Sequence, residues 1–170
     1  MSRHQPSSPE FNKEDFPFYW LARVYGVYTL EMERALKPIG LDIPTWRTLF
    51  ILQQQGASSM SEISLHAVTK LSTVTKTVYR MKAEGLVDTA TSDEDARVTM
   101  VKLTPLGLEA IERGRLATQH IFRRSFDGLT PTQITRLNES LHQILDNLSP
   151  LHSGMAAGRA PGRDAAAGGG

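Results

Sequence analysis

The chain has 170 residues, enough for one compact domain or at most two small ones. Its 19 Lys and Arg residues against 18 Asp and Glu residues exclude a histone-like basic protein and a strongly acidic one. It contains no cysteine, which excludes disulfides, thiolate metal sites, Cys nucleophiles and thiol redox sensing. No apolar run approaches the roughly 18 residues of a membrane span, and the first residues lack the apolar core of a secretory leader. A cytoplasmic protein with no membrane partner is therefore expected.

Both ends of the chain are predicted to be disordered tails. Residues 1–12 are polar and contain two prolines, and residues 151–170 are mostly Gly, Ala, Arg and Pro. A first long helix is predicted over residues 13–36, because the following Lys37-Pro38 ends it. Seven of the twelve aromatic residues lie between positions 11 and 28. This cluster predicts either a core or subunit contact, or the wall of a pocket for an aromatic ligand.

Three shorter helices are predicted next. The first begins near Asp42, a good N-cap residue, and ends at Gly56. The second begins at the capping-box sequence Ser59-Met60-Ser61-Glu62 and reaches about residue 67. The third covers residues 72–84 and is followed by Gly85 as its C′ residue.

A β-hairpin and two long helices complete the prediction. Strands are expected over residues 86–91 and 97–103, joined by a polar turn. One helix should run from residue 105 to about residue 127, and the last begins at the capping box of Thr130 and Gln133. The last helix has apolar residues at alternating spacings of three and four, which is typical of a helix-packing seam. The order predicts a mainly α fold with a small β-ribbon, in which long helices from both termini flank a winged helix-turn-helix over residues 41–104.

The predicted helix over residues 72–84 has two chemically different faces. On a helical wheel, one face is apolar and the other carries hydroxyl, cationic and phenol groups, which bind phosphates and base edges. The residues of the second face are Ser72, Thr73, Lys76, Tyr79 and Arg80. No acidic residue occurs between positions 65 and 83, whereas an ordinary solvated face usually mixes both signs. Residues 61–104 as a whole carry six acidic and six basic residues, so the positive charge is concentrated on this helix. An ordinary solvated face is the alternative.

Four short motifs in this order resemble the MarR family of bacterial transcriptional regulators. They are the run Leu71-Ser72-Thr73-Val74-Thr75-Lys76, the sequence Glu84-Gly85-Leu86-Val87, the motif Asp95-Ala96-Arg97, and the sequence Leu103-Thr104-Pro105-Leu106-Gly107. The stretch Pro44-Thr45-Trp46-Arg47-Thr48-Leu49 is also similar to the second helix of the family. The resemblance covers about residues 15–148. Lys76 stands where Arg is commoner in the family, which replaces a planar fork by a point charge.

The resemblance implies a homodimer on double-stranded DNA. Residues 13–40 and 105–150 are the implied dimerisation helices, residues 72–84 enter a major groove, and Arg97 of the ribbon enters a minor groove, whose negative potential attracts arginine. Asp95 either orients the Arg97 side chain by a charge-assisted hydrogen bond or is an ordinary turn acid. The expected DNA contacts are Ser61, Ser72, Thr73, Lys76, Tyr79, Arg80, Asp95 and Arg97.

The resemblance further implies a ligand pocket between the dimerisation helices and the DNA-binding core. Its candidate lining residues are Tyr19, Trp20, Arg23, Tyr28, Trp46, Arg47 and His66. Aromatic walls with one or two guanidinium groups suit a small aromatic carboxylate or its coenzyme A thioester. The alternative is that Arg23 and Arg47 merely pair with carboxylates such as Glu31 or Asp42.

Catalytic and metal motifs are absent from the sequence. It has no Gly-x-Ser-x-Gly, no P-loop, no dinucleotide fingerprint and no helical pair of histidines with ligand spacing. We therefore expect neither an enzyme nor a cofactor. The expected function is that of a ligand-responsive regulator that binds a pseudo-palindromic operator. We expect it to act as a repressor. A helical protein–protein adaptor without DNA binding is the alternative.

Overall fold

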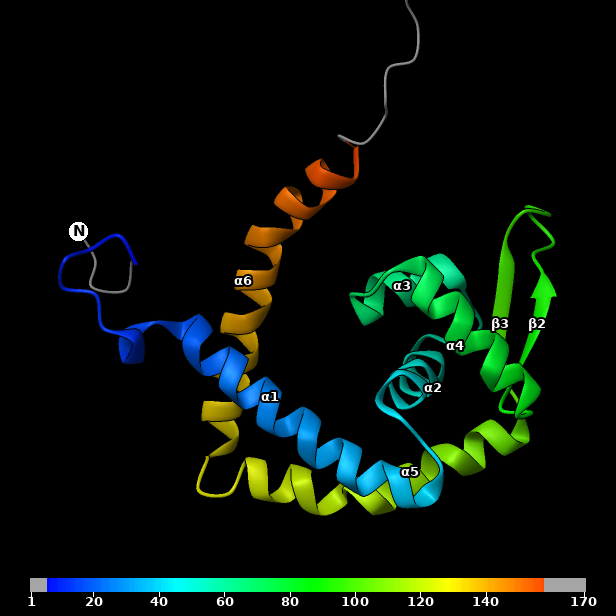
Figure 1. The fold of residues 1–170 in the computed structure, drawn as a ribbon, viewed down its shortest axis with the longest axis horizontal. Coiled ribbons are helices and arrows are strands. Elements are labelled where there is room, and N and C mark those ends of the chain that lie inside the picture. Colours follow the sequence, from blue (N-terminus) through cyan, green and yellow to red (C-terminus); the bar gives the residue numbers. More distant parts are fainter. Residues whose placement is uncertain (1–5, 158–170) are drawn as a thin grey trace, which may run out of the picture. The chain divides into compact units, whose positions relative to one another are not determined.

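The structure is a computed structural model that describes residues 6–157, and it divides into two compact units at the boundary between Ser125 and Phe126. The first unit contains five α-helices and a small sheet, and the second contains one long helix (Figure 1). The elements of the first unit are α1 (Pro17–Leu36), α2 (Ile43–Gln55), β1 (Ser58–Ser59), α3 (Met60–Ala67), α4 (Leu71–Ala83), β2 (Val87–Thr91), β3 (Thr99–Leu103) and α5 (Pro105–Ser125). The second unit contains α6 (Pro131–Ala157). The predicted fold class, mainly helical with a small ribbon, is confirmed.

The chain before α1 differs from the prediction of a tail followed by a helix from residue 13. A single turn of 3-10 helix covers Lys13–Asp15, and Asn12 caps it by accepting a hydrogen bond from the Glu14 N–H (3.1 Å). Phe16 has an extended backbone because the following Pro17 disfavours a helical one. Pro17 then occupies the first turn of α1, where its missing N–H costs nothing. Residues 6–10 form turns, and residues 1–5 lie outside the described chain.

The predicted caps of α2 and α3 are confirmed. The Asp42 carboxylate accepts a hydrogen bond from the Thr45 N–H (2.9 Å) at the start of α2. At the start of α3, the Ser59 hydroxyl accepts from the Glu62 N–H (3.2 Å), while the Glu62 carboxylate accepts from the Ser59 N–H (2.6 Å). These reciprocal bonds satisfy backbone donors that the helix itself leaves free, so both helices begin at defined residues.

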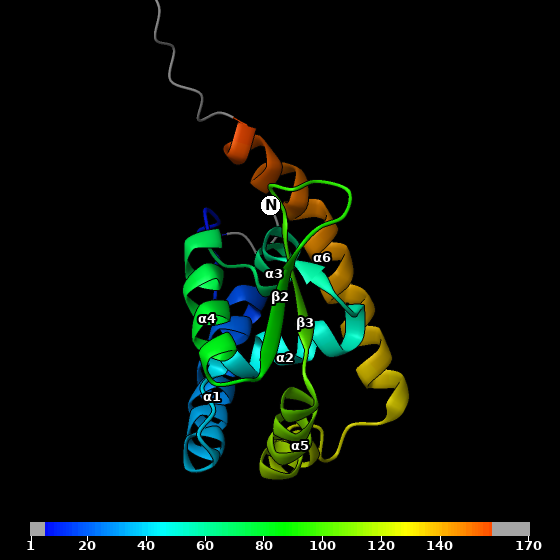
Figure 2. The same ribbon diagram turned by 90° about the vertical axis from the view of Figure 1, so that its right-hand side faces the viewer.

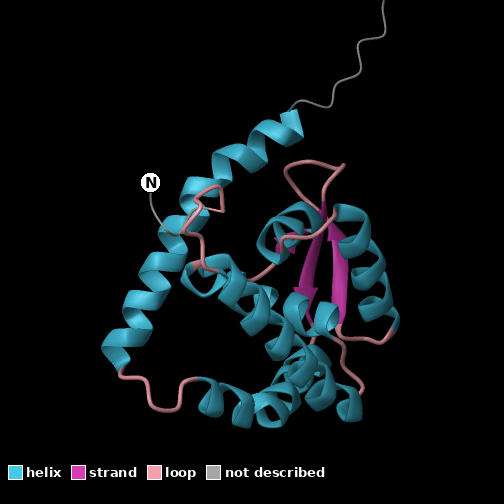
Figure 3. Cartoon of the chain, turned by 60° about the vertical axis from the view of Figure 1, so that its left-hand side comes forward, coloured by secondary structure: helices cyan, strands magenta, loops and turns pink. Residues whose placement is uncertain are grey.

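The sheet has three antiparallel strands in the order β1-β3-β2, one more than the predicted ribbon (Figure 3). Val87 pairs with Leu103 and Thr91 with Thr99 across the hairpin. The returning strand begins at Thr99, two residues later than predicted, because the preceding residues form the turn. Strand β1 has only two serines, so no alternation of apolar residues marks it in the sequence.

The core of the first unit lies between α2, α4, α5 and the sheet. Apolar side chains that are almost completely buried come from each of these elements and from α1 and α3. They include Met32, Leu36, Leu49, Leu52, Ile63, Val74, Val78, Met81, Val101 and Ile111. Helix α1 packs along α5, where the rings of Tyr28 and Phe122 lie 6.3 Å apart. Helix α4 packs on α2, α3 and β2, which leaves one of its faces on the core and the other in solvent.

Trp46 of α2 packs against the backbone of α5 at Gly114. The indole ring is 7% exposed, and a β-carbon at Gly114 would lie 2.6 Å from its Cε3 atom and closer still to Cζ3. Only glycine allows this close approach of a ring to a helix backbone.

Helix α6 begins at the predicted capping box and is longer than predicted. The Gln133 side-chain carbonyl accepts from the Thr130 N–H (2.8 Å), and the Thr130 hydroxyl accepts from the Gln133 N–H (3.3 Å). The helix continues to Ala157, so residues 151–157 of the expected C-terminal tail are helical, in keeping with the strong helix formers Met155, Ala156 and Ala157. The rest of that tail lies outside the described residues.

Candidate nucleic-acid interface

Helix α4 buries its apolar face and exposes its polar face, as predicted. Val74, Val78 and Met81 are at most 2% exposed and contact the core. The residues of the polar face are all exposed, namely Ser72, Thr73, Lys76, Tyr79 and Arg80. Figure 2 shows α4 beside the β2–β3 ribbon, to which the Lys82 ammonium group is tied by a hydrogen bond to the Thr89 hydroxyl (2.6 Å). The helix therefore presents hydroxyl and cationic groups to solvent from a fixed support.

The turn between α3 and α4 sets the direction in which α4 leaves α3. Val68 ends α3 with a left-handed backbone (φ 49°), a conformation that is costly for a β-branched residue. The Ser64 hydroxyl donates to the Thr69 carbonyl (2.7 Å), and the Thr69 N–H donates to the Ser64 carbonyl (3.1 Å). These two bonds hold the turn closed. Ser61, another predicted DNA contact, is exposed in the first turn of α3.

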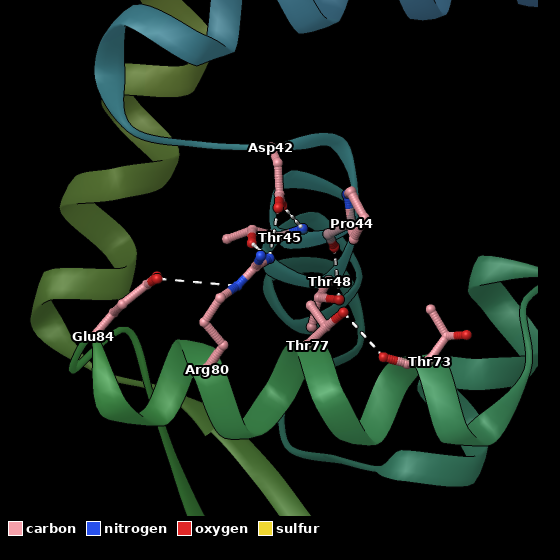
Figure 4. Close-up of polar contacts among 8 residues, drawn as sticks. All are labelled: Asp42, Pro44, Thr45, Thr48, Thr73, Thr77, Arg80 and Glu84. Atoms are coloured by element: carbon pink, nitrogen blue, oxygen red, sulfur yellow. Dashed lines mark hydrogen bonds and ion pairs between the residues drawn. The ribbon is translucent and has the colours of Figure 1, made fainter.

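Arg80 differs from the rest of the polar face because its guanidinium group is bound within the protein (Figure 4). Its Nη2 atom lies 2.6 Å from a carboxylate oxygen of Asp42 and donates to the Thr45 hydroxyl (2.9 Å), and its Nε atom lies 4.0 Å from a carboxylate oxygen of Glu84. Asp42 thus caps α2 and pairs with α4 at the same time. The sequence does not reveal this acid partner of α4, because Asp42 lies on a different helix, thirty-eight positions before Arg80.

The surroundings of Asp42 favour its charged form. Burial alone would raise the pKa of the Asp42 carboxyl, but hydrogen bonds from the side chain and backbone of Thr45 and the guanidinium of Arg80 lower it below the ordinary value of 3.8. At neutral pH, Asp42 therefore carries a full negative charge opposite Arg80.

In the wing, Asp95 and Arg97 are both exposed. The Asp95 carboxylate accepts a hydrogen bond from the backbone N–H of Arg97 (2.9 Å), and the Asp95 carbonyl accepts from the Val98 N–H (2.9 Å). The expected bond from Asp95 to the guanidinium of Arg97 is not present in the described chain, and the alternative of a turn acid accounts for the contact. Asp95 shapes the turn, and the Arg97 side chain projects from it without an ion pair among the described residues.

The seven predicted ligand residues lie at several places in the described chain. Tyr19 contacts Trp20 edge-on and lies under Arg23 (5.6 Å from ring centroid to guanidinium), all near the start of α1. Trp20 donates to the Glu14 carbonyl (2.9 Å). Trp46 belongs to the core, and Tyr28 packs against that core. Burial raises the pKa of the Tyr28 phenol. His66 is exposed at the end of α3.

Arg47 is the predicted ligand residue that lines a cavity between α2 and α4. The cavity measures about 70 Å³, and its lining residues are Ile43, Pro44, Arg47, Thr48, Ala67, Thr69, Thr73, Val74 and Thr77. Arg47 donates to the Ala67 carbonyl (3.2 Å) and to the hydroxyl of Tyr25 (2.9 Å), a residue that was not predicted for the site. This hydrogen bond lowers the pKa of the Tyr25 phenol. The alternative pairing with Glu31 or Asp42 is wrong, since these acids pair with Arg34 and Arg80.

The described residues show neither a metal site nor a membrane-spanning helix. No group of three or more His, Asp or Glu side chains is placed to hold a metal ion. Within the same residues, no helix combines the length and the apolar character that crossing a bilayer requires. The exposed face of α4 and the wing are the candidate DNA-binding surfaces of the described chain.

A helix-turn-helix followed by a β-ribbon, with an exposed polar face on its second helix, defines a winged helix-turn-helix DNA-binding protein. Comparison with known proteins agrees: the profile of the MarR family matches residues 39–98. The HTH-type transcriptional repressor IacR of Pseudomonas putida is 60% identical over 150 residues, which are 88% of this chain and 90% of IacR. The chain belongs to the MarR family of transcriptional regulators.

Solved structures show the same fold. A MarR-family transcriptional regulator from Silicibacter pomeroyi superposes with a TM-score of 0.76 at 25% identity, over 84% of this chain and 96% of that protein. CouR from Rhodococcus jostii RHA1, bound to p-coumaroyl-CoA, superposes with a TM-score of 0.72 at 20% identity, over 79% of this chain and 94% of CouR. Transcription regulation by DNA binding, as a repressor, is thus the class of function that the fold and the relatives support.

Proposed function

We propose that this protein is a ligand-responsive repressor that binds a pseudo-palindromic operator as a homodimer. The observation that carries the proposal is the exposed face of α4, on which hydroxyl groups lie beside the cation of Lys76. Among the described residues Lys76 has no ion pair, and α4 carries no acid before Glu84. Such groups bind phosphates and base edges in a major groove. In this arrangement Arg97 of the wing contacts the adjacent minor groove. The proposed location of the protein is the cytoplasm.

The DNA contacts come from three places in the first unit. Helix α4 supplies Ser72, Thr73, Lys76 and Tyr79, the start of α3 supplies Ser61, and the wing supplies Arg97, whose turn Asp95 holds. All of these side chains are exposed, and the Asp95 carboxylate also accepts a hydrogen bond from the backbone N–H of Arg97. Because the DNA-binding segment has no net charge, affinity depends on geometry and on two protomers binding together more than on bulk attraction.

The proposed dimer is supported by apolar surface outside the core. Helix α1 exposes Val24, Val27 and Leu30, and α6 exposes Leu137 and Leu148. On α6 the apolar positions recur at alternating spacings of three and four, which is the pattern of a helix–helix seam. In this proposal, residues 13–40 and 105–150 of two chains cover these surfaces, since apolar patches of this kind mark interaction sites.

The proposed effector is a small aromatic carboxylate or its coenzyme A thioester, with the predicted lining residues around Arg47 as its site. Arg47 presents a guanidinium group beside the phenols of Tyr25 and Tyr28, and CouR, a structural neighbour, is bound to an aromatic acyl-CoA. The 70 Å³ cavity beside Arg47 is smaller than the roughly 300–1,000 Å³ of ordinary ligand pockets. An aromatic acid would therefore bind a more open state, and it would release DNA only through its higher affinity for that state.

Selection of DNA by the full-length protein tests the proposal. The protein is mixed with a pool of duplexes of random sequence, and bound duplexes are amplified, sequenced and tested by gel shift. We expect enrichment of a pseudo-palindrome whose half-sites lie about one helical turn apart. No enrichment by a folded protein would contradict DNA binding and leave the adaptor function.

Calorimetry tests the effector separately. Benzoate-, cinnamate- and phenylacetate-type acids are titrated into the wild type, Arg47→Ala and the exposed control Arg34→Ala. We expect binding that Arg47→Ala abolishes and Arg34→Ala retains. Binding that is indifferent to Arg47 would contradict the proposed site.

A further inference from the structure

The end of α4 nearest its C-terminus is held to the first turn of α2 by charged groups. Arg80 bridges the Asp42 carboxylate and the Thr45 hydroxyl of α2, as Figure 4 shows, and its Nε atom faces Glu84. Thr45 is buried, so the hydroxyl that receives Arg80 is itself fixed in the protein. We call the three residues Arg80, Asp42 and Thr45 the Arg80 clamp.

The other half of α4 borders a cavity. The 70 Å³ cavity lies between α2 and α4, and Thr73, Val74 and Thr77 of α4 form part of its wall. Close packing is what normally fixes the position of one helix on another, and a cavity removes those contacts. We therefore expect the Arg80 clamp to contribute more to the position of α4 on α2 than an ion pair contributes between two fully packed helices.

The same groups make Arg80 a poor phosphate ligand. The guanidinium carries one positive charge and faces two carboxylates, so this part of the surface is net negative. The side chains of Arg80 and Asp42 are 47% and 44% exposed. A phosphate that reached them would meet the negative charges of Asp42, 2.6 Å from Nη2, and of Glu84, 4.0 Å from Nε, and both charges would repel it. Lys76, one turn earlier, has no ion pair in the described chain.

We propose that Arg80 is a positioning residue, which fixes the orientation of α4 on α2 through Asp42 and Thr45 and does not contact DNA. This inference rests on the proposed function, in which α4 enters the major groove. It divides the polar face of α4 into a DNA-contacting part, from Ser72 to Lys76 and Tyr79, and a supporting part at Arg80. It also assigns a role in DNA recognition to Asp42, a residue on a different helix.

The test compares Arg80→Gln, Asp42→Asn and Lys76→Gln in the full-length protein. Asn is as good an N-cap as Asp, so Asp42→Asn removes the charge and retains the cap of α2. Binding to the duplex selected from the random pool and to a scrambled duplex is measured by fluorescence anisotropy at several salt concentrations. Circular dichroism and thermal melting establish that each variant is folded.

The clamp predicts a loss confined to specific binding. Arg80→Gln and Asp42→Asn should each weaken binding to the selected duplex by about two- to five-fold per protomer, the size expected of a half-exposed ion pair. Binding to the scrambled duplex and the slope of affinity against salt should stay as in the wild type. The double variant should lose no more than either single one, because the two residues act through one contact. Lys76→Gln should weaken both duplexes and flatten the salt slope by about one unit.

Two results would overturn the inference. The first is a flatter salt slope with Arg80→Gln together with weaker binding to the scrambled duplex, which would make Arg80 a phosphate contact. The second is unchanged or tighter binding by Asp42→Asn, which would mean that Asp42 only competes with DNA for Arg80 or is irrelevant to binding. If no duplex is selected at all, or if Lys76→Gln has no effect, it is the proposed function of α4 that fails.

Discussion

The contact between Trp46 and Gly114 predicts that a single methyl group on α5 destabilises the first unit. In Gly114→Ala, the new β-carbon would lie 2.6 Å from Cε3 and 3.0 Å from Cη2 of the Trp46 ring, and closer still to Cζ3. Non-bonded carbon atoms prefer about 3.5–4.0 Å, and the ring is only 7% exposed and surrounded by core. Such overpacking costs about 1–3 kcal/mol, whereas Gly→Ala in a helix otherwise gains about 1 kcal/mol.

Gly26→Ala is the matched control, because Gly26 lies within α1 and a β-carbon there meets no atom within 4 Å. The free energy of unfolding is measured for both variants by urea titration with circular dichroism at one protein concentration. The control removes the helix-propensity gain, so we expect Gly114→Ala to be less stable than Gly26→Ala by about 1–3 kcal/mol. Trp46→Phe, which shortens the ring system, should reduce the penalty of Gly114→Ala when the two are combined. Equal stability of the two alanine variants would refute the close packing of α2 on α5.

Three further predictions concern the wing, the acid stability and the assembly. Arg97→Ala should lose affinity most on operators flanked by A·T-rich DNA, whose minor groove is narrow; equal losses on G·C-flanked operators, measured by anisotropy, would remove the minor-groove role. Because the pKa of Asp42 is lowered below 3.8, its charge stabilises the fold above that pH and this contribution is lost as the pH falls further. The wild type should therefore exceed Asp42→Asn in unfolding free energy by less than about 1 kcal/mol at neutral pH, and this advantage should vanish in acid; an advantage that persists well below the folded pKa would contradict the pairing. Leu137→Glu places a charge on the exposed seam of α6 and should shift the proposed dimer toward monomer in sedimentation. A dimer that persists in this variant would exclude this face from the interface.

Local signals in the sequence accounted for most element boundaries. Asp42 and the pair of Ser59 and Glu62 cap the helices that they were predicted to cap, because a capping bond depends on residues only three positions apart. Gly85 follows α4 with a left-handed backbone, which only glycine adopts at little cost. The two faces of α4 were also predictable, because helical periodicity determines which residues share a face.

Contacts between distant parts of the chain could not be predicted in the same way. Strand β1 exists because β3 offers it a partner, and its two serines carry no strand signal of their own. An aromatic residue such as Trp46 suits a ligand pocket, and the sequence predicts it there. The structure instead buries Trp46 against Gly114 of α5, which lies sixty-eight positions later in the chain. The pairing of Arg80 with Asp42 could not be predicted for the same reason, because it joins two helices across thirty-eight positions of the chain.

Titration of the selected duplex with the wild type and with the variant Ser72→Ala/Lys76→Ala tests the central claim most directly. Both substituted residues are exposed on α4, so the variant should melt like the wild type. The account predicts that the folded variant loses at least about ten-fold in affinity for this duplex, since lost base or phosphate contacts cost roughly 1–3 kcal/mol each. Undiminished affinity in a folded variant would contradict the assignment of α4 as the helix that binds DNA.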